Sequence, residues 1–214
     1  MTWSPTAWPT DGAATAALRD WLAGTPGGEL HGAELDFTGA DLSGGDLTAG
    51  RLDKSSFPRT VLRGCVMARV HCADTDFSDA DLSGADLSAA AGRGAVFRNA
   101  RLAGAALASA EFNRADFTEA DLTGAVLGDA LLTRSTFLRA NLTDVTAEKA
   151  VLRNAILDEA DVNGFTGSVI GPISVIFRGR RSLLDGADLE QWFAARGARI
   201  TRFRADKQPD KDAP

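Results

Sequence analysis

A repeat of five residues runs without a break through the middle of the chain, from Phe37 to Val162. Nearly every fifth position in this frame is a large apolar residue, and the residue two positions earlier is usually alanine. A step of five residues winds around an α-helix and alternates between the faces of a straight strand, so neither element can bury this pattern. The backbone must therefore turn once in each five-residue unit.

A second period, of twenty residues, sets the number of units in one coil. Four units per coil would stack like side chains as ladders on the inner walls of a square solenoid. The ladders are Phe37, Phe57, Phe77, Phe97, Phe117 and Phe137, and Leu42, Leu62, Leu82, Leu102, Leu122 and Leu142. Gly92 removes one inner side chain, and we expect Phe112, one coil later, to lean into the space. We expect wider or less regular corners where Ser55, Thr60, Cys65, Val70 and Thr75 replace alanine.

Several units have a sequence that is typical of a known repeat. Residues 80–84, 85–89 and 120–124 read ADLSG, ADLSA and ADLTG, and they resemble the pentapeptide repeat family, whose consensus is A(D/N)Lxx. The resemblance implies an all-β fold, a right-handed quadrilateral β-helix whose central Leu or Phe and preceding Ala point inward. The segments outside the repeat predict a short helix near each end.

The helices have recognisable start signals. We expect one from Gly12 to Ala23, with Thr10 or Asp11 as N-cap, and one that begins at Gly186 after Asp185. The first helix is predicted to cap the open end of the first coil, and a partner-binding helix is the alternative.

The predicted segments are 1–32, an N-terminal arm and capping helix; 33–166, the pentapeptide repeat β-helix; 167–204, a C-terminal strand–helix cap or dimerisation segment; and 205–214, a disordered tail.

Composition excludes several classes of protein. The net charge of −6 and the pI of about 5.0 argue against a nucleic-acid binder, which would present a basic face. The sequence has neither an apolar run of membrane-spanning length nor a secretory signal pattern, so we expect a cytoplasmic protein. Cys65 and Cys72 are expected to be buried reduced thiols, with a disulfide or redox pair as the alternative.

Catalytic chemistry finds little support in the sequence. His31 and His71 are the only histidines, and they support neither a Ser-His-Asp triad nor a His-rich metal site. A glycine-rich phosphate loop before a helix is also missing. We therefore expect a protein that is not an enzyme and binds no cofactor or metal.

The residue before each central position should point outward, and aspartate is frequent there. The predicted acidic stripes consist of Asp36, Asp41, Asp46, Asp76, Asp81, Asp86, Asp116, Asp121 and Asp161. Basic residues are predicted to gather around another corner, at Lys54, Arg93, Arg98, Arg114, Arg134, Arg139 and Arg153. Two interpretations stay open: a solvated surface set by the repeat consensus, or an acidic rod that imitates duplex DNA.

The DNA-mimic interpretation comes from the family resemblance. Some pentapeptide repeat proteins bind DNA gyrase or topoisomerase IV in place of DNA, and residues 184–197 look similar to the helix that dimerises those proteins. Leu189, Trp192 and Phe193 are then the candidate dimer or docking residues. They would pack on outward apolar residues, Leu131, Val151 and Ile156 among them, in the same chain or across a homodimer. The charge density argues against mimicry of DNA. The rod carries nine of these aspartates over about 31 Å, whereas duplex DNA of the same length carries about 18 charges.

The sequence thus predicts a non-catalytic interaction protein, a homodimer with DNA gyrase as its most specific candidate partner. It would protect against a gyrase-targeting antibiotic. The alternative is a structural or scaffold protein that binds another protein in a biosynthetic or signalling complex.

Overall fold

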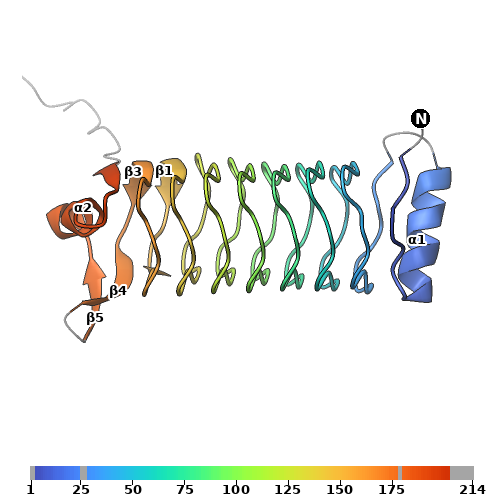
Figure 1. The fold of residues 1–214 in the computed structure, drawn as a ribbon, viewed down its shortest axis with the longest axis horizontal. Coiled ribbons are helices and arrows are strands. Elements are labelled where there is room, and N and C mark those ends of the chain that lie inside the picture. Colours follow the sequence, from blue (N-terminus) through green and yellow to red (C-terminus); the bar gives the residue numbers. More distant parts are fainter. Residues whose placement is uncertain (1–2, 25–27, 178–179, 203–214) are drawn as a thin grey trace, which may run out of the picture.

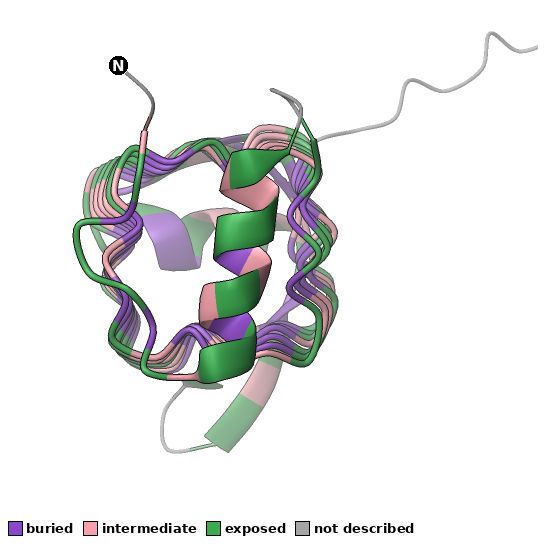
Figure 2. Ribbon diagram, turned by 90° about the vertical axis from the view of Figure 1, so that its right-hand side faces the viewer, coloured by how far each residue is buried: buried purple, intermediate pink, exposed green. Residues whose placement is uncertain are grey.

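The computed structural model describes residues 3–24, 28–177 and 180–202. The chain forms a rod of stacked coils, with α1 (Gly12–Ala23) at one end and α2 (Gly186–Ala194) at the other (Figure 1). Parallel β-bridges join residues twenty apart, from His31 with Arg51 to Asn141 with Asp161. Four five-residue units therefore make one coil, as predicted, and the view along the rod shows four sides (Figure 2). The right-handed sense of the coil stays a prediction from the family resemblance.

Stacked phenylalanine rings form the core on one inner wall. The six rings of the predicted ladder are at most 1% exposed, and successive centroids lie 4.5–5.2 Å apart with interplanar angles of 22° or less. Such parallel rings one coil apart bury large apolar areas. The predicted Phe ladder is confirmed.

Phe112 occupies the space that Gly92 leaves, as predicted. A Cβ built on Gly92 would lie 2.1 Å from Cε1 of Phe112. The Phe112 ring is fully buried and meets the rings of Phe97 and Phe117 edge-on, at 5.2 and 6.0 Å. Gly92 and Phe112 are therefore complementary in shape.

The coil stays regular where polar residues replace alanine, so the prediction of irregular corners is wrong. The twenty-residue bridge spacing continues through this region. The reason is that each polar group bonds within the wall: Thr60 Oγ1 donates to the carbonyl of Phe37 at 2.9 Å, and Cys65 Sγ donates to that of Leu42 at 2.8 Å. Both thiols are free and buried, and burial raises the pKa of Cys65 to about 11.

The solenoid begins one unit earlier than the apolar frame indicates. His31 already pairs with Arg51, and Gly32 takes the central position of this unit. A Cβ on Gly32 would lie 2.8 Å from Cζ of Phe37, so a neighbouring ring fills the place of its side chain. The missing side chain at Gly32 hid this unit from the sequence pattern.

The N-terminal segment covers the first coil. Ala7 pairs antiparallel with Asp41, and the side chain of Asp11 caps α1 by accepting from the amide of Ala14 at 2.7 Å. Ala14 and Leu18 of α1 are buried in the core, and the helix crosses the end of the rod (Figure 2). The predicted helix is confirmed. Neither helix of the described residues is long and apolar enough to cross a membrane.

Coiling continues after the five-residue frame is lost. β1 (Thr146–Val151) pairs with β3 (Thr166–Ile170), and β2 (Ala155–Ile156) pairs with β4 (Ile173–Phe177). The separation of paired residues falls from twenty at Thr146 to nineteen at Ala150 and eighteen at Ala155. The chain thus completes further walls with shorter turns.

Two more strands and α2 close the C-terminal end. β5 (Arg180–Leu184) runs antiparallel to β4, and β6 (Arg199–Arg202) runs parallel to β3, which gives the sheets β2-β4-β5 and β1-β3-β6. Asp185 caps α2, as predicted. The ring of Phe193 lies 5.1 Å from that of Phe165, so α2 packs on the last coil of its own chain.

Candidate interaction surfaces

The outward positions form four walls along the rod. The first wall is Asp36, Ser56, Asp76, Val96, Asp116, Thr136 and Ile156; the second is Asp41, Val61, Asp81, Arg101, Asp121, Asn141 and Asp161; the third is Asp46, Val66, Asp86, Ala106, Val126 and Thr146; the fourth is His31, Arg51, His71, Ala91, Glu111, Leu131 and Val151. On the first two walls aspartate recurs only in every second coil. Neighbouring carboxylates of one wall therefore lie about 10 Å apart.

Each of the nine predicted aspartates has a structural role at its corner. Its Oδ1 accepts a hydrogen bond from the amide two residues further on, over 2.8–3.1 Å. The donors are Thr38, Ser43, Thr48, Ser78, Ser83, Ser88, Thr118, Thr123 and Asn163. Such Asx turns satisfy a backbone group that the sharp bend leaves free. The repeat consensus alone thus accounts for an aspartate at these positions.

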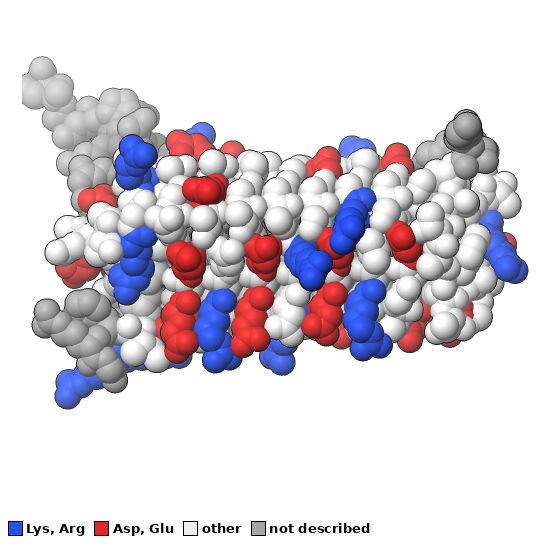
Figure 3. All heavy atoms as spheres, in the orientation of Figure 1, with Lys and Arg blue, Asp and Glu red and all other residues white. Residues whose placement is uncertain are grey.

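Arginines reach onto the acidic walls, so the prediction that charge is separated by side is wrong there. Nε of Arg63 lies 2.6 Å from Oδ2 of Asp81, and Nε of Arg98 lies 2.6 Å from Oδ2 of Asp116. Figure 3 shows Lys and Arg interleaved with Asp and Glu along the visible face. Burial would raise the pKa of Asp81, but hydrogen bonds from Ser83 and Arg63 hold it below the usual value.

The same balance acts at Asp116. Burial raises the pKa of this carboxyl, while hydrogen bonds from Thr118 and Arg98 lower it further than burial raises it. The hydroxyl of Thr38 lowers the pKa of Asp36, and that of Ser43 lowers the pKa of Asp41. All four groups are therefore ionised at neutral pH, and two of them are paired with arginine.

The apolar face of α2 is buried inside the chain. Leu189 and Phe193 are fully buried and Trp192 is 5% exposed. These residues pack on the end of the rod within their own chain, which corresponds to the docking alternative of the prediction, and their role as dimer contacts stays a prediction. Leu131 and Val151 lie half-buried on the fourth wall and Ile156 on the first, whereas α2 crosses the end of the rod (Figure 1).

The structure brings two other apolar side chains to the surface. Ile176 in β4 and Leu183 in β5 are 52% and 63% exposed. They point outward because the strand alternates, with Val175 and Leu184 buried beside them. The sequence reasoning missed this patch, although the alternation from Ile173 onward already separated two faces.

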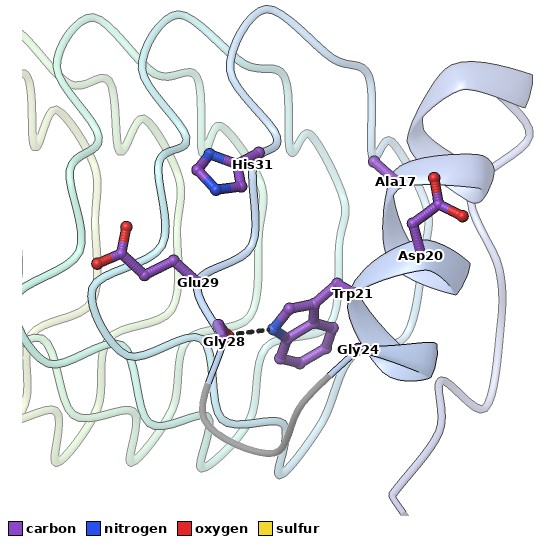
Figure 4. Close-up of a pocket in the computed structure, with 7 residues that line it drawn as sticks. All are labelled: Ala17, Asp20, Trp21, Gly24, Gly28, Glu29 and His31. Carbon is purple, nitrogen blue, oxygen red and sulfur yellow. Dashed lines mark hydrogen bonds between the residues drawn. The ribbon is translucent and has the colours of Figure 1, made fainter.

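A cleft of about 420 Å³ lies between α1 and the first coil (Figure 4). Its lining residues are Ala17, Asp20, Trp21, Gly24, Gly28, Glu29 and His31. The indole of Trp21 donates to the carbonyl of Gly28 at 2.7 Å, and Glu29 pairs with Arg51 at 3.9 Å. In the described part of the chain, no three or more His, Cys, Asp or Glu side chains form a metal-type cluster.

Comparison with known families agrees with this architecture. The family model described as pentapeptide repeats matches eight copies over residues 55–164, which is just over half of the chain. The chain belongs to the pentapeptide repeat family. Members of this family fold as β-helical solenoids. A search of curated proteins gave no match.

Several solved structures are similar to this chain. HetL, a pentapeptide repeat protein involved in heterocyst differentiation regulation from the cyanobacterium Nostoc sp. strain PCC 7120, is 24% identical; the match covers 78% of this chain and 97% of HetL, with a TM-score of 0.27. A trypsin-treated form of QnrB1, a plasmid-mediated fluoroquinolone resistance protein, is 15% identical over 80% of this chain and 92% of its own, with a TM-score of 0.40. Rfr23 from the cyanobacterium Cyanothece 51142 is 20% identical over 67% and 88%, with a TM-score of 0.36.

Proposed function

We propose that this protein is a non-catalytic module that binds another protein through the outer walls of the rod. One observation carries the proposal: most inward positions are filled by buried apolar side chains, so most polar side chains of the coils lie on flat outer walls at fixed spacing. Extended walls of this kind are typical binding surfaces of repeat proteins. The expected location is the cytoplasm.

DNA gyrase is the specific partner that we propose to test first. The aligned carboxylates of the first and second walls and their ionised state support an acidic surface. The carboxylates lie about 10 Å apart, and Asp81 and Asp116 are each paired with an arginine. The negative charge of this surface is therefore less dense than that of DNA. A scaffold role with a different partner is the second candidate, and exposed arginines such as Arg114 and Arg134, which have no ion pair among the described residues, favour it.

The repeat chemistry offers a clean test of the gyrase proposal. Asp76→Asn and Asp121→Asn remove two charges but leave Oδ1 to accept from the amides of Ser78 and Thr123. If the acidic walls bind gyrase, the wild-type chain inhibits supercoiling at micromolar concentration, and the double variant does so several-fold less well. Lack of inhibition by the wild-type chain, together with no rescue of gyrase from a quinolone, would exclude gyrase.

Recovery of partners from a native lysate separates the two candidates. Topoisomerase subunits on immobilised protein support the gyrase proposal, and a different specific partner without them supports the scaffold. An excess of denatured chain provides the control for nonspecific capture. If the folded chain retains nothing that the denatured chain does not, the interaction proposal itself fails.

We also propose that two chains associate at the C-terminal end. Because the apolar face of α2 is buried within its chain, the contact is assigned to the outer face of β4 and β5, where Ile176 and Leu183 are exposed. β5 is an edge strand of its sheet, and exposed apolar edges favour pairing with another chain.

A further inference from the structure

One corner of the rod carries an arginine in each of four consecutive coils. Arg93, Arg114, Arg134 and Arg153 are all exposed, at the corner that follows the fourth wall. The coils stack directly here, since the amide of Arg114 donates to the carbonyl of Thr133 at 3.0 Å and the amide of Arg134 donates to that of Arg153 at 2.8 Å. We call these four residues the arginine ladder.

The four guanidinium groups have no partner within the described residues, where neither a side-chain hydrogen bond nor an ion pair holds any of them. Some other arginines of the rod are held, Arg63 and Arg98 by aspartates and Arg139 by Glu119 at 2.6 Å. Arg59 and Arg69 resemble the ladder in having no ion pair among the described residues. Four neighbouring charges without counter-charges repel one another, so a bound anionic partner would relieve that repulsion.

Few carboxylates lie beside the ladder: Asp74 lies one coil before Arg93 at the same corner, where its amide donates to the carbonyl of Arg93 at 3.0 Å, and no ion pair joins it to the ladder among the described residues. The other corner position in each of these coils is filled by Gly94, Asn113, Thr133 or Asn154. The described fourth wall beside the ladder carries one carboxylate, that of Glu111. Earlier coils of the same corner differ, because Lys54 lies 3.9 Å from Glu34 there. The ladder is therefore local to the second half of the rod.

Apolar side chains lie next to the ladder. Leu131 and Val151 stack as a β-bridge pair on the fourth wall, two residues before Thr133 and Arg153, and both are half-buried. Arginine next to half-buried aliphatic residues suits a protein partner, since arginine is enriched in protein interfaces. Single-stranded nucleic acid would need aromatic side chains for stacking, and the fourth wall beside the ladder, from Ala91 to Val151, carries none.

The spacing of the ladder selects the form of the partner. Coils about 4.8 Å apart place the four arginines over about 14 Å. A helix with carboxylates at i, i+3, i+7 and i+10 places them about 4.5, 10.5 and 15 Å along its axis, which follows the ladder step by step. Alternate residues of a strand are about 6.7 Å apart, so they fall out of register with arginines about 4.8 Å apart after the first contact.

We propose that the arginine ladder, with Leu131 and Val151, is the binding site for an acidic amphipathic helix of a partner protein. This assignment rests on the proposed interaction function, for which it names a surface and a partner chemistry. The partner helix would lie along the rod, with its carboxylates on the guanidinium groups and an aliphatic residue on Leu131 and Val151.

The test uses the full chain and two labelled peptides of equal composition. One peptide carries glutamates at i, i+3, i+7 and i+10 beside leucines, and the other distributes the same residues around the helix. Fluorescence anisotropy should show the phased peptide binding at least fivefold more tightly than its isomer in 50 mM salt. Salt at 500 mM should weaken this binding strongly, because exposed ion pairs are screened. Equal binding of the two peptides would overturn the proposal.

Matched variants locate the site. Arg114→Asn with Arg134→Asn removes two ladder charges, and Arg59→Asn with Arg69→Asn removes two others. All four residues have φ between 55° and 63°, which asparagine tolerates. The double variant of the ladder should bind the phased peptide about tenfold more weakly, because it loses two exposed ion pairs of about 0.7 kcal/mol each. The double variant at Arg59 and Arg69 should bind it less than twofold more weakly.

Equal losses in both pairs, or tighter binding of a twenty-nucleotide oligothymidylate than of the phased peptide, would overturn the ladder proposal. The proposed function is tested by partner recovery with the wild-type chain. The proposed interaction function stands if a specific partner binds the wild-type chain and the double variant Arg114→Asn with Arg134→Asn equally well. In that case only the assignment of the ladder as the binding site fails.

Discussion

The fit of Phe112 against Gly92 gives a quantitative prediction for the core. Gly92→Ala would place a Cβ 2.1 Å from Cε1 and 2.5 Å from Cδ1 of Phe112, whereas ordinary contacts begin at 3.4 Å. The ring cannot move away freely, because Phe97 and Phe117 flank it and Sγ of Cys72 lies 2.9 Å from the new Cβ. Because the clash is with a rigid ring, Gly92→Ala is expected to destabilise the protein.

The expected cost combines two opposed contributions. Overpacking a close-fitting core costs about 1–3 kcal/mol, and the upper end applies to a contact this short. Replacing glycine outside the positive-φ region restricts the unfolded chain and returns about 0.4–1 kcal/mol. Gly92→Ala should therefore lower the free energy of unfolding by about 2 kcal/mol, equivalent to a fall in Tm of about 4–8 °C for a chain of this length.

A double-mutant cycle isolates the contact. Phe112→Leu alone should cost about 1–2 kcal/mol, because it leaves the space beside Gly92 empty. Once the ring is gone, adding Gly92→Ala should cost less than about 0.5 kcal/mol, so the two residues should show a coupling of about 1.5–2 kcal/mol. Gly128→Ala is the control, since its Cβ would meet only the carbonyl of Glu148, at 3.9 Å.

Urea unfolding followed by far-UV circular dichroism is the suitable assay. Tryptophan fluorescence would report the ends, where Trp3, Trp8, Trp21 and Trp192 lie. A Gly92→Ala variant as stable as wild type would refute the shape argument. So would strictly additive effects of Gly92→Ala and Phe112→Leu.

The remaining predictions concern the aspartates and the C-terminal patch. Asp76→Ala should lower the free energy of unfolding by about 1 kcal/mol and Asp76→Asn by less than half as much, because only asparagine keeps an acceptor for the amide of Ser78; equal losses in urea titrations would disprove the Asx role. The lowered pKa values of Asp81 and Asp116 mean that their ionised forms stabilise the fold above the usual carboxyl range near 4, and that this stabilisation disappears as the pH falls through the lowered values. Asp81→Asn with Asp116→Asn should therefore lower Tm more at pH 7 than at pH 2, and a difference independent of pH would contradict this reasoning. Ile176→Ser with Leu183→Ser should convert a dimer to monomers in light scattering, whereas Val66→Ser with Val126→Ser, two exposed valines of the third wall, should not; a monomeric wild-type chain would rule out the dimer.

Sequence and structure agree best where the repeat is strict. The position of an inner side chain depends on its neighbours one coil before and after, and those neighbours are twenty residues away in the sequence. The Phe ladder and the pairing of Gly92 with Phe112 could therefore be read from spacing alone. The first unit escaped notice because Gly32 lacks the side chain that marks the frame.

The candidate surfaces were predicted less well because they depend on long and flexible side chains. Spacing placed Asp81 on an outer wall, but it could not show that Arg63, from the preceding coil, reaches its carboxylate. It also gave the nine aspartates as one acidic set without showing that each closes a turn of its own backbone. Among the seven predicted basic residues, only the structure distinguishes the paired Lys54, Arg98 and Arg139 from the four of the ladder.

The sequence by itself determined the coil: a residue of fixed type every five positions can be buried only if the backbone turns at each unit, and this condition is local. Tertiary structure decided how the rod ends and where its charges lie. The last coils shorten to nineteen and eighteen residues, and α2 turns Leu189, Trp192 and Phe193 onto the rod end. These outcomes depend on which surfaces meet in space, because the terminal segments follow no repeat that would fix their partners in advance.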